Sequence, residues 1–329
     1  MNKSWQVKDI ESDIVYELSA EVINLIKSNS ASKLENDASF KQDLSSLRDD
    51  LNTGSGVKII RNFPIDSDIA ISESNYLDFM RLFGHIMYQN NNGDLVSHIK
   101  NSNVTADDVL KKGLINNQTE NQTKNRPYLS KAYLEFHTDL ADLAGLFCIN
   151  QSNEGGENRV VSSLAVYEKM QTDYPDLLKS ISEPLHLMHQ VPSKKDGKNH
   201  LITHKIFSEQ DGYFASFLLG SYILATYKGM GLDLDPKVAD AIDAIQEIAA
   251  DPQFCLQFKL KPGDILLVNN HLTYHSRYAF EDLAGDMPRH LLRSWVSLYD
   301  NQPLNECYKD LYGADNLSEK SIRGGFSKI

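Results

Sequence analysis

Short apolar runs separated by turns fill most of the chain from residue 131 onward, and this pattern most restricts the folds open to it. The runs are AYLEFH, LFCINQ, RVVSSL, HLITHKIF, ILLVNN and HLLRSWVSL. Helical periodicity interrupts them near residues 164–181 and 235–250. Many short strands with glycine-containing turns predict a β-sandwich or barrel decorated with helices, and they disfavour a doubly wound α/β fold.

The N-terminal part of the chain has a different pattern. IVYELSAEVINLIKS and DASFKQDLSSLRDDL place apolar residues at helical spacing, which predicts two surface helices within about residues 1–55. GVKIIRNFPI then indicates a strand ended by Pro64, and SNYLDFMRLFGHI indicates a further helix. Residues 89–130 are polar and Asn-rich, with one short helix predicted after Thr105. Such segments are lids, binding loops or disordered regions, and we predict a lid.

Size and charge limit the remaining possibilities. A chain of 329 residues is near the upper size for one domain, so we expect a single domain over residues 1–329. The net charge of −12, without a local basic patch, disfavours nucleic acid and membrane surfaces as partners. Three scattered cysteines fit reduced thiols, and no apolar stretch reaches the length of a leader or membrane span. We therefore expect a cytoplasmic protein, whose oligomeric state the sequence leaves open.

One polar pair interrupts the strand-like pattern at LEFHTDLADLAG, residues 134–145, where His137 precedes Asp139 by two positions. Because positions i and i+2 of a strand point to the same face, the pair can converge on one ion if this stretch is extended. Alone, such a triplet favours the plainer interpretation of two polar residues on a half-buried strand. A third ligand is available in KPGDILLVNNHLTYHSRYAF, where a Pro-Gly-Asp turn starts an apolar strand expected to carry His275. His271, four residues earlier, has the same strand parity.

Two histidines and one carboxylate on one face of an octahedral ion leave three coordination positions open, which suits non-haem Fe(II) oxygen chemistry. A second feature lies nearby in RHLLRSW, where Arg289 and Arg293 are four residues apart and share a face whether the segment is helical or extended. A guanidinium matches a carboxylate bidentately, so the pair predicts two carboxylate sites. Structural salt bridges to the abundant acidic residues are the alternative.

In this order, the motifs resemble those of the clavaminate synthase-like and taurine dioxygenase-like Fe(II)/2-oxoglutarate oxygenases. The resemblance covers about residues 57–300 and rests on HTD (137–139), GGENRVVSSLAVYEKM (155–170), KPGDILLVNN (261–270), H-x-R-x-x-F (275–280) and RHLLRSW (289–295). It implies a mainly β fold with flanking helices, the double-stranded β-helix or jelly roll. It also implies that His137, Asp139 and His275, rather than His271, hold Fe(II), although many clavaminate synthase-like members have Glu as the carboxylate ligand.

The resemblance also implies how cosubstrate and substrate bind. Arg289 is expected to bind the distal carboxylate of 2-oxoglutarate, and Arg293 to meet the α-carboxylate of the substrate. Asn158 stands where related enzymes often have a cosubstrate-binding Thr, so Asn158, Ser162 or Ser163 is expected to supply that contact. The implied reaction uses O2 to hydroxylate an unactivated C–H bond, with succinate and CO2 as coproducts. A free L-amino acid is the expected substrate, and a sulfonate or other small acid is the alternative.

A set of candidate substrate contacts and two rival functions complete the sequence interpretation. Glu135, Glu209 or Asp211 is a candidate partner for a cationic group of the substrate. A non-catalytic jelly roll that binds a small acid is one rival function, but the retained ligand set and arginine pair disfavour it. A hydrolase using Cys148 or Ser163 is another, and the apolar surroundings of both side chains disfavour it.

Overall fold

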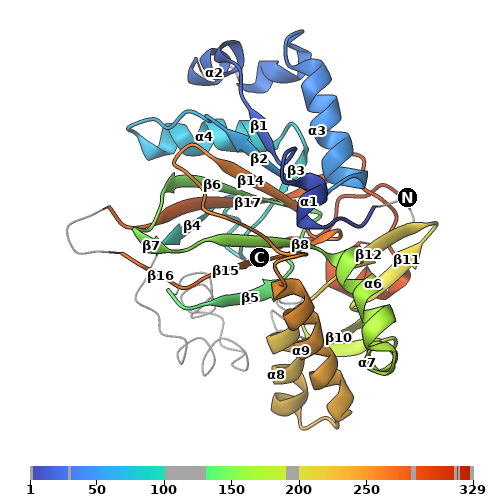
Figure 1. Cartoon of the computed structure of the whole chain (residues 1–329). Helices are drawn as coiled ribbons and strands as arrows, with labels where there is room; N and C mark the ends of the chain where they lie inside the picture. Colours follow the sequence, from blue (N-terminus) through green and yellow to red (C-terminus); the bar gives the residue numbers. More distant parts are fainter. Residues whose placement is uncertain are drawn as a thin grey trace.

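The structure is a computed structural model that describes residues 3–28, 31–100, 131–189, 200–282, 287–314, 317 and 319–326. Its framework is a pair of facing β-sheets, which lie one above the other in Figure 1. The strands of the larger sheet are, in spatial order, β1 (Val15–Glu17), β2 (Val57–Arg61), β14 (Ile265–Asn269), β6 (Leu143–Asn150), β17 (His290–Leu298) and β3 (Gly84–Met87), with β4 (Ser97–Lys100) also on β17. All pairs in this sheet are antiparallel except β1 with β2.

The smaller sheet is antiparallel and faces the larger one. Its strands are β13 (Leu256–Phe258), β8 (Asn158–Ser162), β15 (Thr273–Arg277) and β5 (Leu134–His137). Three strand pairs complete the β structure: β9 (Leu185–Met188) with β10 (Leu201–His204), β11 (Phe207–Gln210) with β12 (Tyr213–Ser216), and β7 (Glu154–Gly155) with β16 (Phe280–Glu281). This arrangement is a jelly roll with flanking helices, which confirms the predicted fold class.

Strand parity divides the apolar residues of the larger sheet between two cores. On β17, Leu292 and Val296 belong to the core under the N-terminal helices, whereas Leu291 and Trp295 belong to the core between the sheets. Neighbouring side chains on a strand point to opposite faces, so β17, like β2, β6 and β14, contributes to both cores. Arg293 has the parity of Leu291 and Trp295, and its side chain therefore faces the space between the sheets.

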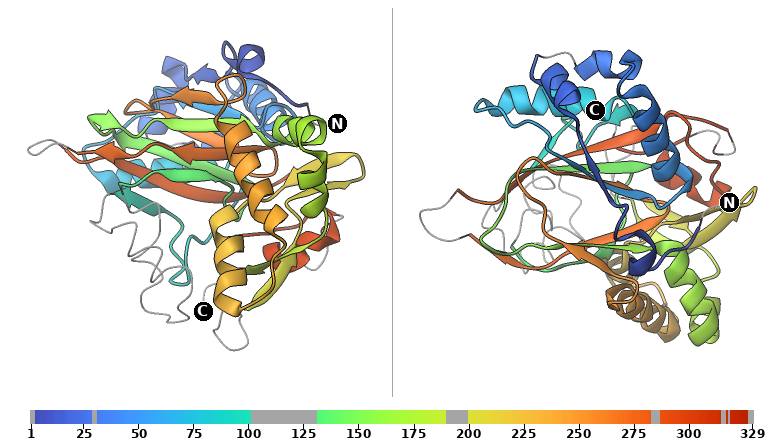
Figure 2. Two further views of the ribbon diagram at one scale, coloured as in Figure 1. Left: turned by 60° about the horizontal axis from the view of Figure 1, so that its bottom comes forward. Right: turned by 45° about the horizontal axis from the view of Figure 1, so that its top comes forward.

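Helices cover two regions of the jelly roll, as Figure 1 and Figure 2 show. The outer face of the larger sheet is covered by α2 (Ala20–Lys27), α3 (Lys41–Thr53) and α4 (Ile69–Met80). Beside the smaller sheet lie α6 (Ser163–Asp173), α7 (Pro175–Ser180), α8 (Gly220–Met230) and α9 (Pro236–Ala250). The short helices are α1 (Val7–Ile10), η1 (Ala31–Asn36), η3 (Glu306–Tyr308) and α10 (Lys309–Tyr312).

The elements differ from the sequence prediction mainly at their ends. The helix predicted from IVYELSAEVINLIKS is α2, which begins at Ala20, because Val15–Glu17 pairs with β2 as a parallel strand. The helix predicted over residues 74–86 is α4, which begins earlier, after the cap residue Asp68, and is followed by strand β3. Tertiary pairing overrides helical periodicity where a short apolar segment meets an open sheet edge. Helix α8 was not predicted.

Part of the predicted lid is in the larger sheet, because residues 97–100 form β4. Residues 101–130, including the helix predicted after Thr105, lie outside the described residues, so the lid stays a prediction, as does the single domain. Among the helices that the structure describes, none combines the length and apolar character needed to cross a membrane. The cytoplasmic location also stays a prediction.

Phe147 anchors the core between the larger sheet and the N-terminal helices. It is fully buried, and its ring lies 5.0 Å from that of Phe63 and 5.5 Å from that of Tyr76. We expect Phe147→Ala to lower the free energy of unfolding by about 3–5 kcal/mol, because it removes apolar contacts and leaves a cavity. Chemical denaturation measures the change. Met230→Ala, at a side chain that is 51% exposed, is the control and should stay within about 0.5 kcal/mol of the parent.

Candidate active site

Three ionisable side chains converge in the space between the two sheets. His137 ends β5, His275 lies opposite it on β15, and Asp139 follows β5 in the connection to β6. One potential ligand atom from each of the three lies within 4.8 Å of the other two. The imidazole rings have their centroids 4.4 Å apart, and His275 Nε2 is 3.8 Å from Asp139 Oδ2. The described residues contain no other His, Cys, Asp and Glu group of this kind.

The structure reaches this arrangement by a different route from the one predicted. The strand that follows the Pro-Gly-Asp turn is β14, which ends at Asn269 in the larger sheet. His275 lies on the next strand, β15, which belongs to the smaller sheet and pairs directly with His137. Likewise, the extended run ends at His137, so the position of Asp139 is set by the connection to β6 and not by strand alternation.

His137 has a defined tautomer. Its Nδ1 lies 2.8 Å from the carbonyl oxygen of Glu135, to which only a protonated Nδ1 can donate, so the lone pair of Nε2 remains for a metal ion. His275 is kept neutral, because burial, with the nearby His137, lowers its pKa to about 3. The Nε2 atom of His137 and the neutral imidazole of His275 are therefore both suited to metal binding.

Asp139 is a buried carboxylate with a cationic partner. Arg293 Nη1 donates to Asp139 Oδ1 at 3.2 Å, and Arg293 Nε donates to Gln89 Oε1 at 3.2 Å. Burial alone would raise the pKa of Asp139, but the Arg293 guanidinium and the two histidines hold it below its ordinary value. The guanidinium also lies 4.6 Å from the centroid of the Trp295 ring. The second arginine of RHLLRSW thus contacts the acidic member of the cluster.

Asn270 holds the backbone around Asp139, and sequence analysis missed it. Its Oδ1 accepts from Asp139 N at 2.9 Å, and its Nδ2 donates to Ala141 O at 3.0 Å. Its own backbone N–H donates to Asp142 O at 2.9 Å. The only sequence signal was a polar Asn-Asn pair at the end of an apolar strand, where a turn would explain it equally well.

Arg289 is a buried cation in a largely apolar setting. It is 2% exposed, its Nε donates to Gln151 Oε1 at 3.0 Å, and its guanidinium lies 5.1 Å from the Phe280 ring centroid. Arg277, which sequence analysis did not single out, lies 4.8 Å from the same ring. Burial lowers the pKa of Arg289 to about 10 and, with Arg289 nearby, that of Arg277 to about 9, so both stay charged at neutral pH. This region between the sheets is therefore electropositive.

The two polar residues predicted to assist Arg289 have different contacts. Asn158 is 4% exposed, and its Nδ2 has no hydrogen-bond acceptor among the described residues. The backbone of Asn158 pairs with that of Arg277 across β8 and β15. Ser162 instead caps α6, because its Oγ accepts from Ala165 N at 3.2 Å. Asn158 thus has an unused donor in the electropositive region, whereas the observed contact of Ser162 is structural.

The predicted acidic substrate partners also have other contacts or positions. Glu135 Oε1 accepts from the backbone N–H of Ser221 at 3.0 Å and from its hydroxyl group, so Glu135 caps the first turn of α8. Glu209 and Asp211 are exposed on the β11–β12 hairpin. None of these contacts tests a role in substrate binding, and the assignment of Glu135 stays a prediction.

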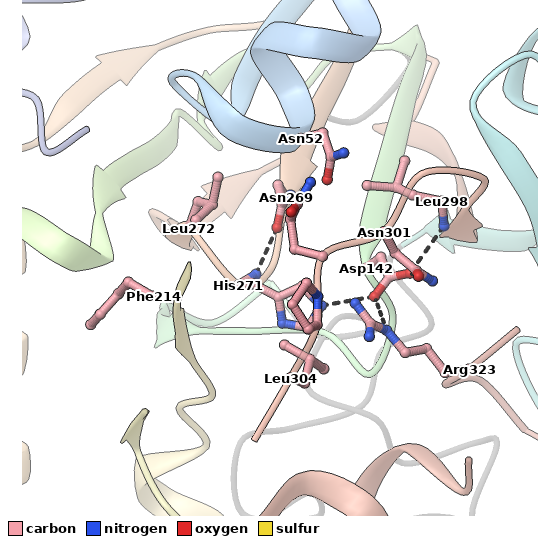
Figure 3. Close-up of a pocket in the computed structure, with 12 residues that line it drawn as sticks. Asn52, Asp142, Phe214, Asn269, His271, Leu272, Leu298, Asn301, Leu304 and Arg323 are labelled. Carbon is pink, nitrogen blue, oxygen red and sulfur yellow. Dashed lines mark hydrogen bonds and ion pairs between the residues drawn. The ribbon is translucent and has the colours of Figure 1, made fainter. Parts of the chain in front are cut away.

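His271, the alternative metal ligand, lies in the turn before β15 and not on the strand, so the parity argument does not apply to it. Its Nε2 lies 2.8 Å from Asp142 Oδ1, as Figure 3 shows. Asp142 is fully buried and also binds Arg323. His271 thus belongs to a separate polar cluster beside a small pocket lined by Asn52, Asp142, Asn269, Leu298 and Asn301, among others.

The donor set of this site fits an iron ion and a dicarboxylate. Imidazole and carboxylate ligands in a two-His, one-carboxylate set are those of non-haem Fe(II) oxygenases. The fixed tautomer of His137 and the neutral state of His275 make both imidazoles competent ligands. The buried Arg289 guanidinium and the unpartnered Nδ2 of Asn158 fit a bound carboxylate, because buried polar groups without partners are rare.

The jelly roll and this interior site define the chain as a non-haem iron oxygenase of the 2-oxoglutarate-dependent class. Residues 28–295 match the family described as "Taurine catabolism dioxygenase TauD, TfdA family", and the chain belongs to this family. The chain is 27% identical over 254 residues to the FR-33289 synthase of Streptomyces rubellomurinus, a match that covers 75% of this chain and 70% of the relative.

Two solved structures have the same fold. An asparagine oxygenase in complex with Fe(II), 2S,3S-3-hydroxyasparagine and succinate aligns with a TM-score of 0.62 and 15% identity, over 86% of this chain and 93% of that one. The non-haem iron oxygenase OrfP, in complex with Fe, succinate and (3S)-hydroxy-L-Arg, aligns with a TM-score of 0.58 and 13% identity, over 86% of this chain and 94% of that one. At these sequence identities, the likeness shows a shared fold alone.

Cys148 is a core residue and a poor nucleophile. It is fully buried on β6, and burial raises the pKa of its thiol to about 12, despite the nearby Arg289. At pH 8 only about one thiol in ten thousand would be ionised. We expect iodoacetamide to leave Cys148 unmodified in the native protein and to alkylate the half-buried Cys307 first. Mass spectrometry before and after unfolding in urea measures this order, and rapid native alkylation of Cys148 would restore the hydrolase interpretation.

Proposed function

We propose that the chain uses His137, Asp139 and His275 to bind Fe(II), and that it hydroxylates a C–H bond of a free L-amino acid. The observation that carries the proposal is the convergence of these three side chains, which face a buried and electropositive region between two sheets. His137 and His275 come from paired strands of one sheet, so a rigid backbone holds them. Such rigidity favours a metal site, because the ligands do not have to be ordered when the ion binds.

We assign the 2-oxoglutarate contacts to Arg289 and Asn158. Arg289 is a fixed cation that can bind the distal carboxylate bidentately, and its buried setting strengthens that interaction relative to water. Asn158 Nδ2 is a donor that a carboxylate oxygen would satisfy. Ser162 stays a weaker candidate, because its hydroxyl group caps α6.

The amino acid substrate is inferred from Arg293 and from the structural neighbours. Arg293 faces the space between the sheets and contacts Asp139, so a carboxylate bound to it would lie beside the metal ligands. The asparagine oxygenase and OrfP structures contain hydroxylated amino acids, which supports a substrate of that class. A sulfonate or another small acid would use the same guanidinium and is the alternative.

The residues of the chain have three tasks in this reaction. Fe(II), when bound with 2-oxoglutarate and O2, supplies the oxidising chemistry. His137 offers its Nε2 and His275 its neutral imidazole as ligands, and Asp139 stays ionised beside Arg293. Arg289 and Arg293 orient cosubstrate and substrate by their carboxylates. Apolar residues of both sheets exclude water from the space around them.

The metal assignment is tested by a spectrum and by a product. We expect the wild-type protein, given Fe(II) and 2-oxoglutarate without oxygen, to show a weak charge-transfer band in the visible and to release succinate after an oxygen pulse. His137→Ala and Asp139→Ala should lose the band and release succinate only at background, because each removes one ligand. His85→Ala, at an exposed histidine on β3, is the matched control. Succinate release by His137→Ala at the wild-type rate would contradict the assignment.

The two arginines are expected to affect different ligands. Arg289→Gln should weaken 2-oxoglutarate binding about tenfold or more, because it removes a charge-assisted pair, whereas Arg293→Gln should leave it nearly unchanged. Arg293→Gln should instead abolish the stimulation of succinate release by the substrate. Titration of the visible band measures the first effect, and a screen of L-amino acids and simple sulfonates measures the second. If no amino acid stimulates wild-type turnover, the substrate proposal fails while the oxygenase proposal stands.

A further inference from the structure

The C-terminal residues 323–326, Arg-Gly-Gly-Phe, lie against the connection that carries Asp139. Gly325 N donates to Leu140 O at 2.7 Å, and Arg323 Nε donates to Asp142 Oδ1 at 2.7 Å. Figure 3 shows Arg323 and His271 converging on Asp142. These C-terminal residues lie beyond residues 28–295, the part of the chain that matches the family.

Asp142 joins the C-terminal segment to the larger sheet. Its Oδ1 accepts from Arg323 and His271, and its Oδ2 accepts from Leu298 N and Asn301 Nδ2, both at 3.0 Å. A carboxylate with this many donors has one fixed orientation. Because Asp142 is three residues after Asp139, it fixes the far end of the connection, while His137 on β5 fixes the near end.

The approach of the C-terminal segment is so close that it requires glycine at two positions. Gly324 has φ +80°, and a Cβ there would lie 2.8 Å from Leu140 O and 3.2 Å from Ala141 Cα. Gly325 has φ +69°, and a Cβ there would lie 2.6 Å from Met87 Cβ. Both the backbone conformation and the available space therefore exclude larger residues. The close packing of the C-terminal segment therefore depends on glycine at positions 324 and 325.

Phe326 extends the contact of the C-terminal segment toward Arg293, through the Trp295 ring. Its backbone N–H donates to Tyr88 O at 2.9 Å, and its ring stacks on Trp295 with centroids 6.1 Å apart and an interplanar angle of 13°. Trp295 in turn contacts the Arg293 guanidinium, which binds Asp139. The C-terminal segment thus supports Asp139 by two routes, through the backbone of the connection and through the Trp295 ring.

The Arg323–Asp142 pair stabilises the fold inefficiently, because burial removes the hydration of both charges. Arg323 is 1% exposed, and its Nη1 and Nη2 have no hydrogen-bond partner among the described residues. Desolvation of such a pair can exceed the attraction between its charges, so an apolar pair of similar volume would often be at least as stable. In some proteins, buried ionic pairs select one arrangement of the chain. The Arg323–Asp142 pair joins the C-terminal segment to the connection that carries Asp139.

We infer that residues 323–326 form a latch that positions Asp139 for metal binding, with Arg323 as a positioning residue. The inference rests on the proposed assignment of Asp139 as a ligand. Asn270 holds the middle of the connection, and the latch holds its far end and its outer side. A displaced latch would leave the fold intact but would weaken iron binding, because the carboxylate would have to be ordered when the ion binds.

Two glycine variants test the latch at matched backbone strain. Gly324→Ala adds a Cβ against the connection, whereas Gly231→Ala, at φ +63°, adds one where nothing lies within 4 Å. The positive φ is unfavourable for alanine in both, so Gly231→Ala controls for backbone strain, whereas Gly324→Ala should melt at a lower temperature because its Cβ also lies 2.8 Å from Leu140 O. We expect the apparent Kd for Fe(II), measured anaerobically from the charge-transfer band with 2-oxoglutarate, to rise about tenfold in Gly324→Ala. In Gly231→Ala it should stay within about twofold of the wild type.

Arg323 variants give an independent comparison that holds even if Gly324→Ala does not fold. Arg323→Gln should raise the Kd for Fe(II) about tenfold, and Arg323→Lys should restore part of the affinity, because it keeps a charged donor for Asp142. Lys58→Gln is the control for the loss of a buried cation, since Lys58 is 7% exposed and pairs with Asp13 at 2.8 Å, outside the active site.

The outcomes separate the latch from the proposed function. Wild-type affinity for Fe(II) in both Gly324→Ala and Arg323→Gln overturns the latch and leaves the metal assignment intact. Equal weakening in Arg323→Gln and Lys58→Gln also overturns it, because a general loss of stability would then explain both. Absence of the band in the wild-type protein overturns the metal assignment itself, and the latch with it.

Discussion

The connection between β5 and β6 is the constraint on which the site depends. The connection has five residues, between the end of β5 at His137 in the smaller sheet and the start of β6 at Leu143 in the larger sheet. It has no regular secondary structure, so its backbone groups must find partners outside the strand pairs. Asn270 supplies two of these hydrogen bonds, and Gly325 supplies a third. The site therefore combines two histidines on rigid strands with an aspartate on a segment that neighbouring residues have to hold.

Burial of charge follows from the same arrangement. Asp139, Arg293 and Arg289 all lie between the sheets, where each would be costly alone. Asp139 and Arg293 compensate one another directly, whereas the Arg289 guanidinium donates to the neutral Gln151, and Asp282 Oδ1 accepts from the Arg289 backbone N–H. This asymmetry is expected of a site that binds an anionic cosubstrate, because the missing negative charge arrives with the ligand. The free-energy cost of burying the Arg289 guanidinium is thus explained by its proposed function, because the cosubstrate carboxylate would offset this cost when it binds.

Sequence reasoning grouped three side chains that the structure brings together, but it did not predict the elements that carry them. His137, Asp139 and His275 could be named because ligand chemistry restricts their types and the motifs fix their order, yet His275 lies on a different strand from the one expected. The four-residue spacing predicted only that Arg289 and Arg293 share a face, and in the structure Arg293 faces the space between the sheets. The roles of Asn270 and Arg323 could not be read from the sequence, because each depends on a contact with a residue more than a hundred positions away. Turn signals near them have simpler local explanations.

The contact between Arg293 and Asp139 links metal binding to substrate binding. Arg293 is proposed to bind the substrate carboxylate, and in the structure it donates to Asp139, the proposed acidic ligand. A substrate carboxylate bound there would share this guanidinium with Asp139, and a shift of Arg293 toward the substrate would change the hydrogen bonding of Asp139. Trp295, which contacts both Arg293 and Phe326, limits that shift. Support from the C-terminal segment would then affect not only where Asp139 lies but also how far Arg293 can move.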